Sequence, residues 1–305
     1  MPIATRTSRH WNVATSEPTA PPTAAWAVGT DVGVPTGTSL TTRTSLGSPT
    51  STGTYELVDP TGRESPVTVD VDIFEDIEYT VGIVAQRTTG NVRLFRRCRF
   101  AIAGGTTLLE CDEEGNSGTT SYMTPRVIVD HCTFDGNSAT TKCISGGNVW
   151  VIDSHLANSE DGAGGPFCSV FIRCNVIGNT DGAVDPHADG VQLLGIGKAV
   201  FWHSFISAGS IPGAASQALR IGAEFSGNDD VYIAWCLLDG DAGGWTLQAR
   251  GDNNPTEDNT NITVRDTVVL PGGFGSVDFV ESSVALWERV YSDTYGGTPI
   301  ANPAP

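Results

Sequence analysis

The sequence predicts an all-β solenoid, in which short strands stack coil upon coil after an extended N-terminal arm. Three observations support this fold class. A pattern of apolar residues around one small residue recurs along residues 91–292, and a second short strand recurs between its copies. The composition agrees, because 36 of the 305 residues are glycine and abundant turn formers favour short strands. No stretch shows the apolar period of a helix.

The charge balance excludes several kinds of partner. The chain has 35 acidic and 17 basic residues, which gives a formal charge of −18. Binding to nucleic acid and to anionic membranes needs a surface rich in lysine and arginine, so we expect neither partner. The apolar runs are far shorter than the roughly 20 residues needed to cross a bilayer, and the first residues lack the apolar core of a secretory signal.

The first 90 residues divide into two parts. Residues 1–30 are rich in proline, threonine and alanine, which is typical of an extended arm. The arm carries Trp11 and Trp26, and it is either a disordered tail or a segment whose tryptophans dock onto a partner or the domain end. Residues 31–90 form an irregular β-rich lead-in, within which residues 67–73 alternate apolar and polar like a half-buried strand. This lead-in is either a subdomain or the first coils.

The repeat becomes visible when the chain is aligned on one small anchor residue per copy. Apolar residues stand five and three positions before the anchor and two positions after it, as in Val127, Val129, Cys132 and Phe134. The anchors are residues 98, 132, 154, 174, 204, 236, 267 and 289. Short copies separated by variable insertions are typical of a β-solenoid. We therefore predict a solenoid over residues 91–292 and a C-terminal tail over residues 293–305.

The chain must bend just before each anchor. The apolar positions change parity there, whereas a continuous strand keeps its apolar residues on one face. A small residue at an inward bend avoids a clash with its equivalent about 4.8 Å away in the next coil. We expect an internal ladder of small residues, which Arg289 breaks in the last copy, and we expect His131 and His203, just before two anchors, on the surface. The ladder includes Cys98, Cys132, Cys174 and Cys236.

The second strands predict a binding surface. If they stack in register, one outward column contains Gln192, Arg220, Gln248 and Asp278. Long polar side chains in a row suit a polysaccharide, and Arg220 is able to clamp a carboxylate sugar. An ordinary solvated face explains the same residues equally well.

The candidate catalytic residues lie in the loop from Asp181 to Gln192. They are Asp185, His187 and Asp189. Paired carboxylates serve acid–base hydrolysis of glycosides, and clustered carboxylates also bind Ca²⁺, which a lyase uses to acidify a uronate. The alternative is a turn in which aspartate satisfies backbone donors, and we prefer this interpretation for Asp181.

Two segments resemble known proteins. Residues 33–40 read GVPTGTSL and are similar to a GVPxGTxLT segment of β-helix proteins from actinobacteria and their phages. Residues 185–192 read DPHADGVQ and are similar to the HxDGIQ motif of the same group, with Val191 in place of isoleucine. With the repeat, they resemble the pectate-lyase-like superfamily of right-handed parallel β-helices, and within it minor tail proteins and tail spikes of phages that infect GC-rich Gram-positive hosts.

The resemblance implies a virion component that is made in the host cytoplasm. Such a protein forms a homotrimer, faces host-surface polysaccharide and attaches to other tail proteins through residues 1–30. Two alternatives stay open. A polysaccharide depolymerase, either a lyase or a hydrolase, would use the loop from Asp181 to Gln192. A purely structural tail protein with a degenerate groove also fits, because a solenoid stacks without an active site.

Overall fold

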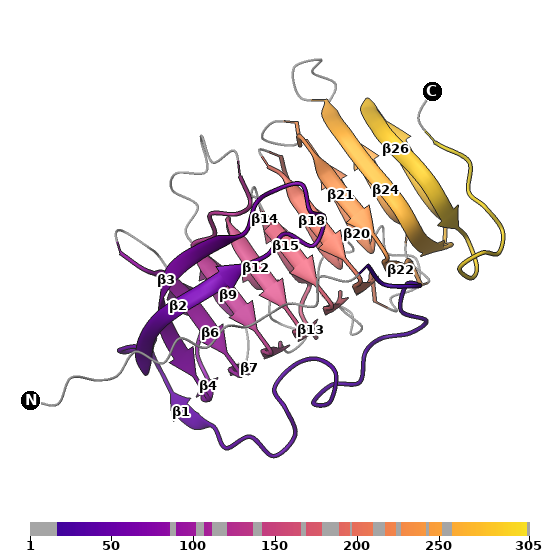
Figure 1. Cartoon of the computed structure of the whole chain (residues 1–305). Coiled ribbons are helices and arrows are strands. Elements are labelled where there is room, and N and C mark those ends of the chain that lie inside the picture. Colours follow the sequence, from indigo (N-terminus) through magenta and orange to yellow (C-terminus); the bar gives the residue numbers. More distant parts are fainter. Residues whose placement is uncertain are drawn as a thin grey trace, which may run out of the picture.

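The computed structural model is an all-β stack of coils (Figure 1). It describes residues 17–85, 90–101, 107–111, 121–136, 142–165, 169–178, 189–195, 197–209, 217–223, 227–241, 244–251 and 258–303. No helix occurs in these ranges, so none of them holds a helix that is long and apolar enough to cross a membrane.

Most strands are short, and the longest ones lie near the two ends of the chain. In chain order they are β1 Thr41–Arg43, β2 Ser51–Leu57, β3 Val67–Glu75, β4 Ile77–Tyr79, β5 Ile83–Ala85, β6 Val92–Arg96, β7 Arg99–Ala101, β8 Leu109–Cys111, β9 Val127–Asp130, β10 Thr133–Asp135, β11 Lys142–Ser145, β12 Val149–Ile152, β13 His155–Ala157, β14 Asp161–Gly165, β15 Ser169–Ile172, β16 Asn175–Ile177, β17 Val191–Leu193, β18 Ala199–Trp202, β19 Phe205–Ser207, β20 Leu219–Gly222, β21 Val231–Ala234, β22 Leu237–Asp239, β23 Trp245–Arg250, β24 Asn259–Leu270, β25 Gly275–Val280 and β26 Ser282–Tyr291.

Each central coil gives two consecutive strands to a large sheet and one strand to a small sheet. In one such coil, β12 and β13 belong to the large sheet of 18 strands and β14 to the small sheet of eight. Equivalent strands of neighbouring coils pair in parallel, so that Val151 lies beside both Val129 and Phe171. Figure 1 shows the resulting stack of coils. The chain is therefore a parallel β-helix, as the repeat predicts.

One residue with positive φ makes the bend between the two large-sheet strands of a coil. Its φ lies between 47° and 57°, in the left-handed region that residues other than glycine seldom occupy. The bend residues are Asp76, Arg97, His131, Asp153, Arg173, His203, Trp235, Asp266 and Arg289. From residue 97 to residue 266 each of them directly precedes a predicted anchor, so the bend falls where the parity of the apolar residues changes.

The anchors form the predicted ladder inside the bend. Ser154 Oγ accepts the backbone N–H of Cys132 at 3.0 Å, and Cys132 Sγ accepts that of Cys98 at 3.3 Å. Ser204 and Thr267 accept the equivalent N–H groups from their neighbouring coils. These contacts pair backbone donors that would otherwise be buried without an acceptor, which is costly.

The last coil is displaced by one residue from the sequence alignment. Ile262 pairs with Val284 and Thr263 with Leu286, so Ala285 is an extra residue in β26. After this bulge, Thr267 pairs with Val290, which therefore holds the anchor position. The expectation that Arg289 breaks the ladder was wrong, because Arg289 is the bend residue and points its guanidinium at the carboxylate of the bend residue before it.

The first coil lies inside the region predicted as an irregular lead-in. β3, β4 and β5 pair in parallel with β6, β7 and β8 of the next coil. β2 instead forms an antiparallel hairpin with β3, and the turn of this hairpin lies on the outer face of the large sheet. Asp59 Oδ2 accepts a hydrogen bond from Tyr122 Oη at 2.8 Å, and Arg63 is ion-paired with Asp230. The hairpin thus covers a second apolar cluster outside the solenoid.

The arm runs along the bends of the large sheet, opposite in direction to the growth of the coils (Figure 1). Glu17 is ion-paired with Arg265 of β24. The backbone N–H of Trp26 donates to Asn175 Oδ1, and Asn175 Nδ2 donates to the carbonyl of Trp26, both at 2.8 Å. The described part of the arm therefore docks onto its own solenoid, while Trp11 lies outside the described residues.

The interior of the solenoid is a continuous apolar cluster to which both sheets contribute. Aromatic rings of neighbouring coils stack inside it, and the centroids of Phe100 and Phe134 are 4.4 Å apart with an interplanar angle of 3°. Such a pair adds about 0.5–1.5 kcal/mol beyond its buried area. At the C-terminal end the tail folds back, and Trp287 Nε1 donates to the carbonyl of Ile300 at 2.8 Å.

Candidate functional site

The four residues of the predicted binding column stand in register on the small sheet. Gln192 lies beside Arg220, Arg220 beside Gln248, and Gln248 beside Asp278. Three of these side chains are partly exposed, whereas Gln248 is only 7% exposed. The predicted stacking is confirmed, and glycan binding by the column stays a prediction.

A hydrogen-bonded cluster forms the C-terminal end of this column. Asp278 Oδ2 accepts bonds from Gln248 Nε2 at 3.0 Å and from Arg250 Nη2 at 2.6 Å. Arg250 was not among the residues predicted from the sequence, although it lies two positions after Gln248 and therefore on the same face of β23. Its side chain is 54% exposed. The cluster thus presents a guanidinium and a carboxylate to a ligand at the surface.

The structure describes one of the three candidate catalytic residues. Asp185 and His187 lie outside the described residues, as does Asp181. Asp189 is fully buried, and its Oδ1 accepts the backbone N–H of Gln217 in the next coil at 2.7 Å. This contact is the structural role that carboxylates take in turns. Catalysis by these residues and Ca²⁺ binding in their loop stay predictions.

Asp161 occupies the equivalent position one coil earlier. Its Oδ1 accepts the backbone N–H of Asp189 at 3.0 Å, so carboxylates link three successive coils here. Burial raises the pKa of Asp161 to about 6, although that N–H and the ammonium of Lys142, 3.7 Å from Oδ2, oppose the shift. The folded protein therefore holds a titrating carboxyl within its wall.

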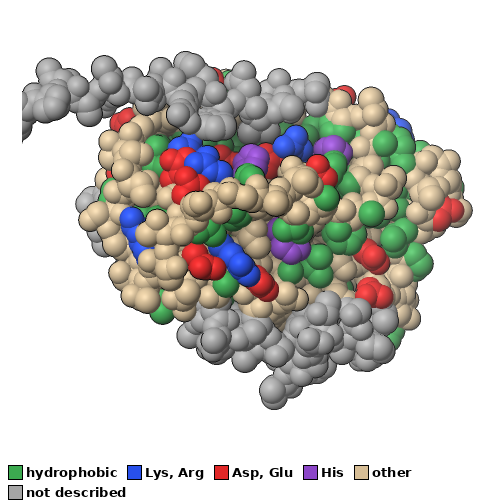
Figure 2. Space-filling model, turned by 90° about the horizontal axis from the view of Figure 1, so that it is seen from below, with side chains coloured by type: hydrophobic (Ala, Val, Ile, Leu, Met, Phe, Trp, Pro, Cys, Tyr) green, Lys and Arg blue, Asp and Glu red, His purple; other side chains and the backbone are tan. Residues whose placement is uncertain are grey.

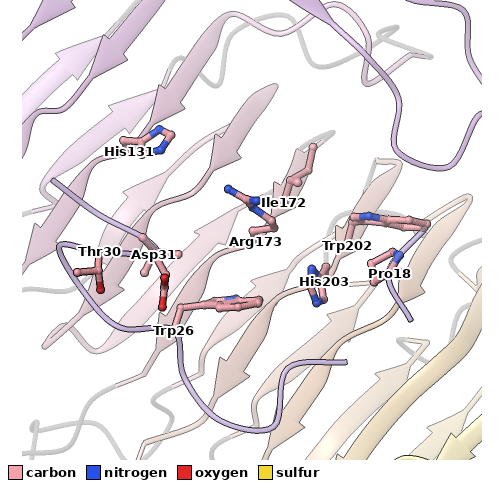
Figure 3. Close-up of a pocket in the computed structure, with 10 residues that line it drawn as sticks. Pro18, Trp26, Thr30, Asp31, His131, Ile172, Arg173, Trp202 and His203 are labelled. Atoms are coloured by element: carbon pink, nitrogen blue, oxygen red, sulfur yellow. The ribbon is translucent and has the colours of Figure 1, made fainter. Parts of the chain in front are cut away.

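A cavity of about 400 Å³ lies between the arm and the bends of the large sheet (Figure 3). It is lined by Pro18, Trp26, Thr30, Asp31 and Val32 of the arm and by His131, Ile172, Arg173, Trp202 and His203 of the solenoid. Figure 2 shows histidine, acidic and basic side chains gathered on this face. His131 and His203, predicted as surface residues, are thus cavity-lining residues, because the bend points them outward and the arm then covers them.

One wall of the cavity is formed by His131 and Arg173, which belong to a hydrogen-bonded network with two carboxylates behind them. His131 Nδ1 is 2.6 Å from Asp130 Oδ1, and this hydrogen bond raises the pKa of His131. His131 Nε2 is 3.8 Å from Asp153 Oδ2, and Arg173 Nε donates to Asp153 Oδ1 at 2.6 Å. Asp130, His131 and Asp153 lie close enough together to hold a metal ion. The imidazole of His131 and the guanidinium of Arg173 already contact the two carboxylates, however.

Trp26 and His203 form the opposite wall. Their rings meet edge to face with centroids 5.0 Å apart. Burial lowers the pKa of His203, so its neutral form is favoured at neutral pH. Trp26 Nε1 is buried and has no hydrogen-bond acceptor among the described residues. The cavity therefore combines a neutral aromatic wall, which carries a buried donor, with a charged wall.

Comparison with known proteins adds no argument about the fold or the activity of this chain. No protein-family model and no curated protein matches the chain. Among solved structures, the A-module of mannuronan C-5 epimerase AlgE4 from Azotobacter vinelandii is similar to it, with 10% sequence identity, 74% of this chain and 91% of that chain covered, and a TM-score of 0.25. At these values the likeness carries no argument about activity. The chain's own strand pairing defines it as a parallel β-helix.

Proposed function

We propose that this chain is a β-helical tail protein of a bacteriophage and that its small sheet binds host-surface polysaccharide. The observation that carries this proposal is the in-register column of Gln192, Arg220, Gln248 and Asp278. A row of hydrogen-bonding groups that repeats from coil to coil fits a linear polymer of hydroxyl-rich units better than a compact ligand. The tail role is proposed from the resemblance of residues 33–40 and 185–192 to β-helix proteins of actinobacteria and their phages, some of which are tail proteins.

The chemistry of the column suits hydroxyl and carboxylate groups of sugars. Arg220 and Arg250 offer fixed arrays of donors. Asp278 receives its described hydrogen bonds from other residues on Oδ2, so within the described residues Oδ1 is left to accept from a sugar hydroxyl. Donors and acceptors thus lie side by side, as recognition of hydroxyl groups requires.

The assembly proposed for the virion is a homotrimer attached to other tail proteins by the N-terminal end of the arm. Residues 17–30 already contact the solenoid of their own chain, as Trp26 does with Asn175. We therefore place the attachment to tail proteins in residues 1–16. Native mass spectrometry of the purified chain should give a trimer, and a monomer at micromolar concentration would contradict this part of the proposal.

Glycan binding is tested by cosedimentation with insoluble envelope polysaccharide from GC-rich Gram-positive cells. Arg220→Ala should weaken binding about tenfold, the usual effect of losing a charged hydrogen bond. Arg99→Ala is the matched control, since Arg99 is an exposed, ion-paired arginine on the large sheet. Absence of binding by the wild-type protein would reject the function, and equal binding by Arg220→Ala would reject the column. New reducing ends or unsaturated-sugar absorbance in the same tubes would identify a depolymerase.

A further inference from the structure

We infer that the cavity under the arm is a second saccharide site, which takes a single neutral sugar ring. This inference rests on the proposed glycan-binding function and places another site on a different sheet of the solenoid. The cavity is formed by the arm and the bends of the large sheet, whereas the column belongs to the small sheet.

The size and the lining of the cavity fit a small polyhydroxylated ligand. Its volume of about 400 Å³ falls within the roughly 300–1,000 Å³ that is usual for small-molecule sites. Trp26 supplies aromatic surface for the C–H face of a ring, while Thr30, Asp31 and Arg173 supply hydrogen-bonding groups. A sugar presents both kinds of surface, because each hydroxyl donates and accepts.

The indole of Trp26 gives the site a specific requirement. Its Nε1–H is buried without an acceptor among the described residues, although a buried tryptophan usually has a partner for this group. The backbone of Trp26 is fixed to Asn175 by two hydrogen bonds, and its ring is fixed against His203. A ligand oxygen in the cavity would satisfy a donor that the fold has already positioned, and such preorganisation favours binding.

The charges around the cavity favour a neutral ligand over an ion. The carboxylates of Asp130 and Asp153 contact the imidazole of His131 and the guanidinium of Arg173. Asp31 and Arg173 give the lining one carboxylate and one guanidinium, so the lining has no excess positive charge that would favour an anion. A cation would have to compete with the guanidinium of Arg173 and the imidazole of His131, which already contact the carboxylates of Asp130 and Asp153. A neutral sugar meets neither obstacle.

The test is a titration of the full-length protein with D-glucose, D-galactose and N-acetyl-D-glucosamine, followed by ¹⁵N-tryptophan NMR. The wild-type protein should bind at least one of them saturably below about 50 mM, which is the weak range expected for one ring. The spectrum of Trp26→Phe lacks one indole N–H signal, which identifies the signal of Trp26. In the wild-type protein this signal should shift during the titration. Trp26→Phe keeps an aromatic ring and should bind about fivefold more weakly, the effect of one hydrogen bond.

Two controls separate this inference from the function proposed for the column. Trp287→Phe changes an indole whose Nε1 already donates to Ile300 and should leave monosaccharide binding unchanged. Arg220→Ala should also leave it unchanged while it weakens binding to the polysaccharide. Absence of saturable binding to all three sugars, or unaltered binding by Trp26→Phe, would overturn the inference while leaving the column to be judged by its own test.

Discussion

Replacing Ser154 with alanine tests the ladder that joins successive coils. Ser154 is fully buried, its Oγ accepts the N–H of Cys132 at 3.0 Å, and it donates to the carbonyl of Ile152 at 2.7 Å. That carbonyl also accepts the backbone N–H of His131 at 3.0 Å, so it keeps a partner after the substitution. The substitution therefore leaves one buried group, the N–H of Cys132, without its acceptor.

The expected cost follows from that one group. A buried donor without a partner costs about 1–3 kcal/mol, and in a chain of this length each kcal/mol lowers the melting temperature by about 2 °C. Ser154→Ala should therefore lower the melting temperature by roughly 2–6 °C. Ser154→Cys should cost less, because a thiol takes the same role where Cys132 Sγ accepts the N–H of Cys98.

Thermal unfolding followed by circular dichroism, with urea unfolding as a second method, measures both variants. Ser204→Ala is an independent repeat of the experiment, since Ser204 Oγ accepts the N–H of Cys174 at 3.1 Å. A loss for Ser154→Ala below about 0.5 kcal/mol, the ordinary scatter of surface substitutions, would refute a stabilising ladder. A loss for Ser154→Cys as large as that for alanine would show that volume, and not the acceptor, decides the effect.

Two further predictions concern pH and the arm. Burial raises the pKa of Asp161 to about 6, so the stability it contributes is lost as pH rises from about 4 through 6. Urea unfolding of Asp161→Asn should show its stability relative to the wild type rising across this window. For Asp293→Asn, whose carboxyl pKa is lowered by backbone hydrogen bonds, the stability relative to the wild type should fall as pH rises toward about 4 and stay constant above it. A pH-independent difference for Asp161→Asn between about pH 4 and 6, or for Asp293→Asn below about pH 4, would contradict the corresponding prediction. A Cβ on Gly33, at φ +78°, would lie 2.6 Å from Thr133 Oγ1, so Gly33→Ala should loosen the arm and speed its proteolysis. Gly37→Ala is the control, because Gly37 also has a positive φ of +86° but an added Cβ would meet no atom within 4 Å, so this variant has the backbone strain without the clash. Equal cleavage of both variants would count against the contact between residue 33 and Thr133.

The coils were predictable from the sequence because each bend imposes a change of parity and a small inward residue. The predicted anchors from Cys98 to Thr267 keep their positions in the structure. The pattern failed at Arg289 because the bulge at Ala285 shifts the register by one residue, and a single inserted residue leaves an apolar pattern that fits either alignment. The sequence left open whether residues 31–90 hold a subdomain or the first coils, because β3 serves both a hairpin and the solenoid.

The two candidate sites differ in how far sequence could find them. The column was predictable because residues alternate between the two faces of each strand, and the second strands all start this alternation at the same point. Gln192 and Arg220 could therefore be placed side by side from the sequence. The cavity depends on a contact between Trp26 and Asn175, which are 149 residues apart in the chain. No local pattern encodes where an extended arm will lie, and the histidines beneath it therefore looked like ordinary surface residues.

The bend explains how a site can be built on this solenoid with little cost to its fold. A non-glycine residue in the left-handed region costs about 1–2 kcal/mol, and such strain often marks a functional residue. Here every bend carries it, with φ between 47° and 57° from Asp76 to Arg289, so the strain belongs to the architecture. The inward anchor forms the bonds between coils, whereas the outward bend residue is free to vary in type. The side chains at this repeated backbone position differ in chemistry, as His131, Arg173 and His203 do. The arm lies across this row of bend residues on the large sheet.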